Sequence, residues 1–187
     1  MIRLHALLFS LLIALPFTSA RADEYADTVK LFRDAGKSAQ FFDKSYGYAV
    51  FPTIGKGGIV IGGAHGSGQV YVKGKHVGDT SMTQLSIGPQ LGGQAYSQII
   101  FFQDKRAFDE FASGNFEFGA QASAIAITAG ASAQATTGGA GAGASGTQNH
   151  AKTASNYHGG MAVFTIAKGG LMYEASIGGQ KFSYKPR

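Results

Sequence analysis

The chain has 187 residues, no cysteine and a formal net charge of +5 at pH 7, with no run of Lys or Arg. These values exclude disulfides and cysteine-ligated metal sites, and they argue against a nucleic-acid-binding protein. With 44% hydrophobic residues, the chain can build the core of a single domain.

Residues 1–22 have the layout of a secretory signal peptide. Arg3 precedes an apolar run over residues 6–15, and Ala20-Arg21-Ala22 gives a small-x-small cleavage pattern. The run is shorter than the roughly 20 apolar residues of a membrane span. We therefore expect a cleaved leader, a single mature domain over residues 23–187, and a location in the periplasm or at the cell-envelope surface. The protein is not expected to be a lipoprotein, because it has no cysteine.

The first predicted element of the mature chain is a helix over residues 23–43, which Gly36 weakens and can divide in two. Apolar residues recur at helical spacing, at Tyr25, Val29 and Phe32. The helix also carries three cations, Lys30, Arg33 and Lys37. They offer a basic face to an anionic membrane. The alternative is an ordinary solvated face, which the intervening acidic residues favour.

From Tyr48 onward the apolar residues follow the period of strands. The run that begins at Tyr48 is expected to stop at Pro52, because proline cannot donate to a central ladder. Lys56-Gly57-Gly58 then predicts a tight reversal, and the glycines of residues 62–68 predict another bend.

The remaining chain predicts further strands around one short helix. The helix covers residues 105–112, with Asp104 as its N-cap. A small-residue strand follows over 115–134, and residues 136–147 read as a flexible Gly/Ala-rich loop. The other strands are expected over 69–73, 81–87, 92–102, 154–164, 170–177 and 180–184.

A repeat links the two parts of the sheet. The segment 49–59 returns as 162–171 when Pro52 is skipped, so that Lys56-Gly57-Gly58 matches Lys168-Gly169-Gly170. This predicts two similar hairpins, and chance recurrence in a chain with 28 glycines is the alternative.

These motifs also resemble a known family. Phe51-Pro52, Lys56-Gly57-Gly58 and the stretch 62–68 resemble the signature of the SYLF domain, a lipid-binding domain, and the likeness continues through 115–123 and 168–171. The resemblance implies a phospholipid- or envelope-associated protein of bacterial secreted type. Eukaryotic relatives are associated with phosphoinositide membranes, often through an N-terminal amphipathic helix, and some bind actin.

The expected fold is α+β: an N-terminal helix plus a strongly bent, mostly antiparallel β-sheet or partly closed barrel with one short inserted helix. No catalytic, metal or cofactor site is predicted. Ser67 lacks the GxSxG spacing, the histidines lack HExxH, and Lys56 lacks the spacing of a phosphate-binding loop. The chain is therefore not expected to be an enzyme.

The expected function is non-enzymatic binding of anionic phospholipids or a membrane surface. Backbone N–H groups of a glycine turn with an adjacent ammonium can hold a phosphate. The predicted head-group residues are Lys56, Gly57, Gly58, Lys168, Gly169 and Gly170. For each lysine, the alternative is that it only keeps a turn solvated. A structural or adhesive envelope protein that acts through a protein partner is the alternative function, and an integral outer-membrane protein or a hydrolase is less favoured.

Overall fold

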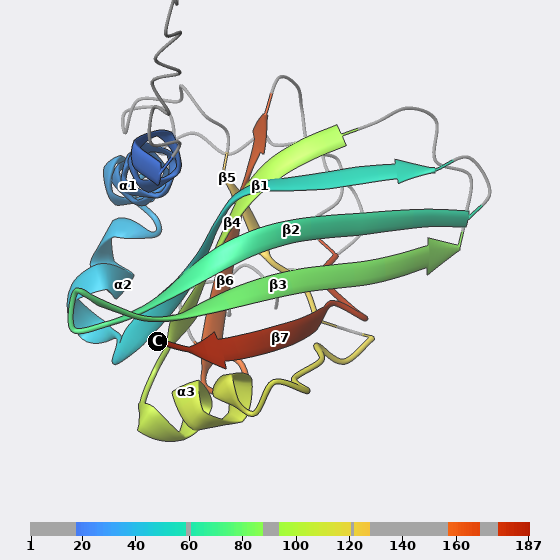
Figure 1. The fold of residues 1–187 in the computed structure, drawn as a ribbon. Helices are drawn as coiled ribbons and strands as arrows, with labels where there is room; N and C mark the ends of the chain where they lie inside the picture. The colour runs from blue at the N-terminus through green and yellow to red at the C-terminus, as the bar shows by residue number, and fades with distance from the viewer. Residues whose placement is uncertain (1–17, 59–60, 88–93, 121, 128–156, 169–175) are drawn as a thin grey trace, which may run out of the picture.

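The computed structural model describes residues 18–58, 61–87, 94–120, 122–127, 157–168 and 176–187 (Figure 1). Most of the predicted leader, the whole of the 136–147 loop, and both Gly169 and Gly170 lie outside these residues.

One seven-stranded sheet carries the fold. Its strands lie in the order β5 (Ile125–Ile127), β6 (Met161–Lys168), β4 (Gln94–Phe102), β1 (Gly47–Gly58), β2 (Ile61–Val72), β3 (Lys75–Ile87) and β7 (Lys181–Pro186). All neighbours are antiparallel except β5 and β6, which are parallel. The α+β class with a mostly antiparallel sheet is confirmed. Among the described strands the sheet is not closed, since β5 and β7 stand at the two ends of the strand order.

Strand β1 is longer than its sequence suggested, because it runs through Pro52. The prediction that a central strand stops there was wrong. The ladder to β2 shifts register between Val50 and Ile54, and the ladder to β4 shifts between Phe51 and Ile54. The proline therefore lies in an irregularity where no ladder donor is needed. The Ser97 hydroxyl donates to the Pro52 carbonyl at 2.7 Å.

The glycines expected to bend the chain after Ile61 lie inside strand β2 instead. Gly66 and Gly68 are buried on one side of the strand. A Cβ atom at Gly66 would lie 2.6 Å from Cγ1 of Ile54, and one at Gly68 would lie 2.6 Å from Cε1 of Phe51. The bend prediction was therefore wrong. These residues are small because side chains of β1 pack over them.

Helices α1 (Thr18–Asp34) and α2 (Ala39–Lys44) pack on one face of the sheet, which we call the α1 face (Figure 1). The expected single helix is divided at Gly36, which has φ of 66°. The predicted stripe does face the sheet, since Phe32 is fully buried. This core contains Phe32, Phe41, Val50, Ile99, Phe101, Ala162, Phe164 and Ile166.

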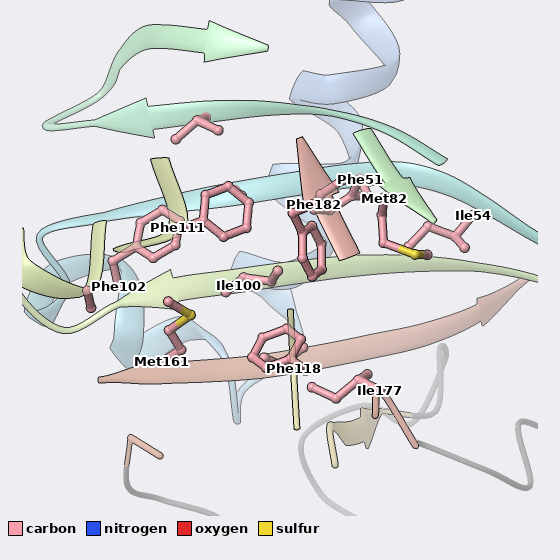
Figure 2. Packing of buried hydrophobic residues seen from close by; sticks show 14 of the residues in the cluster. Phe51, Ile54, Met82, Ile100, Phe102, Phe111, Phe118, Met161, Ile177 and Phe182 are labelled. Atoms are coloured by element: carbon pink, nitrogen blue, oxygen red, sulfur yellow. The ribbon is translucent and has the colours of Figure 1, made fainter. Parts of the chain in front are cut away.

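The opposite face, the α3 face, holds the larger core (Figure 2). Helix α3 (Lys105–Ala112) has the bounds that the sequence indicated, and the Asp104 carboxylate accepts from the Ala107 N–H at 2.9 Å. Core side chains shown in the figure include Phe51, Ile54, Met82, Ile100, Phe102, Phe111, Phe118, Met161, Ile177 and Phe182.

A buried amide pair ties β4 to the chain just before β7. Gln98 donates to Gln180 at 2.9 Å and accepts from it at 3.2 Å. Gln180 also donates to the Tyr96 hydroxyl at 3.2 Å. All three side chains are at most 5% exposed. They satisfy one another inside an apolar core, so they stabilise one arrangement of these segments.

The long strand expected over 115–134 is not formed in the described part of that stretch, where only β5 is a strand. Residues 116–118 instead run beside β7. The Phe182 N–H donates to the Phe116 carbonyl at 2.9 Å, and the Phe118 N–H donates to the Gln180 carbonyl at 3.0 Å. Glu117 forms an isolated antiparallel bridge with Lys181, and the flanking Phe116 and Phe118 pack into the α3-face core.

Candidate functional site

The two repeated segments become β1 and β6, which flank β4 on either side. Lys56 pairs with Gln94, and Lys168 pairs with Ala95. Both lysines therefore reach the same end of the sheet. Successive residues of a strand point to opposite faces, so Lys56 lies on the α3 face and Lys168 on the α1 face. The structure does not direct the two lysines at a single point.

Lys168 has partners on the α1 face. Its ammonium donates to the Thr53 hydroxyl at 2.5 Å and lies 3.7 Å from Oε1 of Glu24. The Thr53 hydroxyl in turn donates to that carboxylate at 3.0 Å. This exposed pair links α1 to the end of β6, and it is worth at most about 1 kcal/mol.

Lys56 lies within a ladder instead of a turn. Lys56 pairs with Ala64, Gly57 with Gly63, and Gly58 with Gly62. The tight reversal predicted at Gly57 and Gly58 was therefore wrong, because both residues still belong to β1. The connection to β2 is at residues 59–60, outside the described part of the chain.

An exposed leucine lies in the same row as these glycines. Leu85 pairs with Gly63, which pairs with Gly57. On the α1 face Leu85 therefore stands beside two positions without side chains, and it is 84% exposed. We call Lys56, Gly57, Gly63 and Leu85 the strand tip. It lies where β1 and β3 end and β2 begins, at the right of Figure 1.

Sequence reasoning missed Leu85. The signal was the spacing of two apolar residues, Met82 and Leu85, which are three positions apart in one strand and so point to opposite faces. Since Met82 is buried, Leu85 lies on the other face. A large apolar side chain on a solvated face is the observation that needs a reason, particularly among small neighbours.

The predicted basic face of the N-terminal helix is divided among different contacts. Lys30 donates to Asp34 at 2.5 Å, and this hydrogen bond raises the pKa of the ammonium. The Arg33 guanidinium carbon lies 4.2 Å from the centre of the Phe42 ring. Lys37 is exposed between α1 and α2. This mixture is typical of a surface helix.

A ladder of rings crosses the α1 face at the other end of the strands. Tyr48 stacks on Tyr71 with ring centres 5.2 Å apart, and Tyr71 stacks on His76 at 5.3 Å. Arg187 donates to Nδ1 of His76 at 3.0 Å. Burial raises the pKa of both tyrosines. We call Tyr48, Tyr71 and His76 the ring ladder; the sequence did not single it out, because its members come from three strands.

Within the described residues, no group of three or more His, Asp and Glu side chains could hold a metal ion. Among the helices of that same part of the chain, none has the length and apolar character needed to cross a bilayer.

Comparison with known proteins gives two matches. Residues 83–186 match the family model Ysc84, described as "Las17-binding protein actin regulator". The chain is also 32% identical over 161 residues to "Beta cell expansion factor A" of Aeromonas veronii. That alignment covers 84% of this chain and 53% of the relative, so the chain spans about half of the relative's length.

Proposed function

The chain belongs to the Ysc84 (SYLF) family, and on that premise we propose that it binds phospholipid membranes without catalysing a reaction. We further propose that it acts in the periplasm or at the cell-envelope surface, after removal of residues 1–22.

The observation that carries the proposal is the 84% exposure of Leu85 at the strand tip. Moving a leucine side chain from water into an apolar medium is favourable by about 1.5–3 kcal/mol. Gly63, which pairs with Leu85, and Gly57, which pairs with Gly63, have no side chains that would hold a bilayer away. An added Cβ at Gly57 would meet nothing within 4 Å. Leu85 can therefore enter the acyl region without rearrangement of its neighbours.

Lys56 supplies charge near the same tip. A lysine close to an anionic membrane contributes about 1 kcal/mol, and this contribution falls with added salt. Lys168 lies on the other face and pairs with Glu24, so we propose a smaller contribution from it. Head-group binding through Lys56-Gly57-Gly58 and Lys168-Gly169-Gly170, and contact through Lys30, Arg33 and Lys37, stay predictions.

The test is flotation of the protein with neutral and with anionic phospholipid vesicles at low and high salt. Wild type is expected to float with anionic vesicles. Leu85→Ser should weaken the partition about tenfold or more, as the transfer energy above implies. Leu31→Ser tests α1 in the same assay, because Leu31 is 40% exposed and lies beside Lys30. Flotation like wild type would confine the apolar contact to the strand tip, whereas an equal loss would assign a membrane contact to α1 as well.

The double variant Lys56→Ala and Lys168→Ala tests the charge contribution separately. It should weaken flotation with anionic vesicles only, with little change in melting temperature. An unaltered partition in this variant would remove the lysines from the mechanism. Absence of wild-type flotation under every condition would refute membrane binding itself.

A protein partner is the second candidate, and a bare part of the sheet favours it. On the α1 face of β2, β3 and β7, one cross-strand row is small and polar, namely Ser67, Ser81 and Ser183. The hydroxyls of Ser81 and Ser183 lie 2.7 Å apart. Charged residues flank this row, with Lys181 on one side and Asp79 and Lys185 on the other. A polar face of this kind suits a structural or adhesive contact with another envelope protein. That function predicts partner capture without lipid, and it would be preferred if wild type failed to float.

A further inference from the structure

The β2–β3 hairpin ends in a turn that carries exposed cations. Val72 pairs with Lys75, so Lys73 and Gly74 form a two-residue turn with φ of 49° and 75°. Lys73 and Lys75 are both exposed. Lys44, also exposed, ends α2 just before β1, whose Gly47 pairs with Val72. We call Lys44, Lys73 and Lys75 the hairpin end; Figure 1 shows this turn beside α2.

The lysine in this turn has an unfavourable backbone conformation. Within the described residues, Lys73 is the one non-glycine residue with positive φ. A side chain in the left-handed region is strained, and two-residue hairpin turns prefer Asn, Asp or Gly there. A lysine at this position despite the strain points to a use for its charge.

The surroundings of the hairpin end suit an anionic phospholipid surface. The ring ladder starts within two residues of the turn, at Tyr71 on one strand and His76 on the other. Half-buried tyrosines with a polar rim are enriched at membrane interfaces. The exposed carboxylate of Asp43 offsets part of the positive charge of the three lysines. The carboxylate of Asp79 instead accepts a hydrogen bond from His76 at 3.0 Å.

The hairpin end is distant from the strand tip. Lys75 and Leu85 are ten residues apart on β3, which at about 3.3 Å per residue is roughly 33 Å. The charges of the hairpin end therefore act independently of Lys56 at the strand tip, because the Debye length at physiological salt is about 8 Å. The strand tip and the hairpin end lie at opposite ends of β3, so a bilayer that the strand tip meets end-on does not reach the hairpin end.

From this geometry we propose that the hairpin end binds a second anionic phospholipid surface, so that one molecule bridges two bilayers. The proposal rests on the proposed function, since the strand tip supplies the first contact. Its distinguishing consequence is vesicle clustering, which a protein with a single contact surface does not cause.

The experiment compares binding with clustering on vesicles of phosphatidylglycerol and phosphatidylcholine. Flotation reports binding, and dynamic light scattering reports the mean vesicle diameter. Wild type should float and increase the diameter severalfold. The double variant Lys73→Asn and Lys75→Gln should float within about twofold of wild type but leave the diameter close to that of vesicles alone. Asparagine suits the left-handed turn position, so this variant keeps the hairpin.

The matched control removes the same number of charges elsewhere. Lys105 and Lys181 are exposed and lie in ion pairs with Asp109 and Glu117. The double variant Lys105→Gln and Lys181→Gln should cluster vesicles as wild type does. Equal loss of clustering in this control would overturn the proposal in favour of a net-charge effect.

Three other results would also overturn bridging. The first is wild-type flotation without clustering, which leaves the proposed function intact. The second is continued clustering by the hairpin variant, as expected if a protein dimer joins the vesicles through its tips. The third is loss of flotation in the hairpin variant, which would make the hairpin end the primary contact. By contrast, no flotation of wild type refutes the proposed function itself.

Discussion

Substituting Gly68 by alanine tests whether β2 is a packed strand or a bend. In the structure, an added Cβ would lie 2.6 and 2.7 Å from two ring carbons of Phe51 and 2.9 Å from Cγ2 of Thr80. Ordinary contacts are 3.4–4 Å. Phe51 is fully buried and Thr80 is 5% exposed, so neither can move aside freely. Overpacking of this kind costs about 1–3 kcal/mol.

A smaller effect of opposite sign must be subtracted. Alanine reduces the conformational freedom of the unfolded chain, which stabilises the folded state by about 0.4–1 kcal/mol. The net loss for Gly68→Ala is therefore at most about 2.6 kcal/mol, and about 1.3 kcal/mol at the middle of the two ranges. For a domain of this size, that middle value lowers the melting temperature by about 3–5 °C.

Gly55→Ala is the matched control for this assay. Gly55 lies on the adjacent strand, has no positive φ, and has nothing within 4 Å of an added Cβ. Urea unfolding should show Gly55→Ala at or slightly above wild-type stability and Gly68→Ala below it. Equal midpoints for the two variants would refute the packing argument, because they would show that Gly68 is not under the Phe51 ring.

Three further predictions concern stability. Asp104→Ala should lower the urea-unfolding free energy by about 1 kcal/mol, since it removes the acceptor for the first-turn N–H of α3; an unchanged midpoint would contradict the cap. Burial keeps the pKa of Tyr96 well above its ordinary 10.0, against the opposing hydrogen bond from Gln180. The unfolded chain therefore ionises first, so stability should fall as pH rises above about 10, and Tyr96→Phe should reduce that slope by up to about 1.4 kcal/mol per pH unit; equal slopes would argue against burial. Lys73→Asn should raise the melting temperature slightly by relieving the left-handed turn, and a decrease would contradict the strain assigned there.

Local signals in the sequence predicted the elements that local interactions determine. The helix α3 follows from Asp104 as a cap and from phenylalanines at helical spacing, and its bounds were confirmed. The division near Gly36 follows from the low helix propensity of glycine. The family and the mostly antiparallel α+β fold were also confirmed.

The errors concern residues whose roles depend on distant partners. Pro52 was read as a strand end, yet both neighbouring strands adjust their register around it. Gly66 and Gly68 were read as a bend because glycine is common in turns. Their true role is set by Ile54 and Phe51, which the chain brings over them from β1.

The placement of the two lysines shows the same limit at the site. The repeated segments both form strands, β1 and β6, but their pairings with β4 are offset by one residue. The second predicted hairpin, beyond Lys168, lies largely outside the described residues. Because side chains alternate with a period of two, an offset of one residue moves a side chain to the opposite face. No feature of the repeat itself gives this offset. The sequence thus indicated which end of the sheet holds Lys56 and Lys168, but not that they point apart.

The strand tip allows function to be tested separately from stability. Leu85 is 84% exposed, so its replacement removes little packing, and its row is held by the ladder through Gly63 and Gly57. A loss of vesicle binding in Leu85→Ser with an unchanged melting temperature would therefore report the contact itself. Lys168 separates the two less cleanly, because its removal also breaks the exposed link to Glu24 on α1, worth at most about 1 kcal/mol. Leu85 is for this reason the more decisive residue, although the motif drew attention to the lysines first.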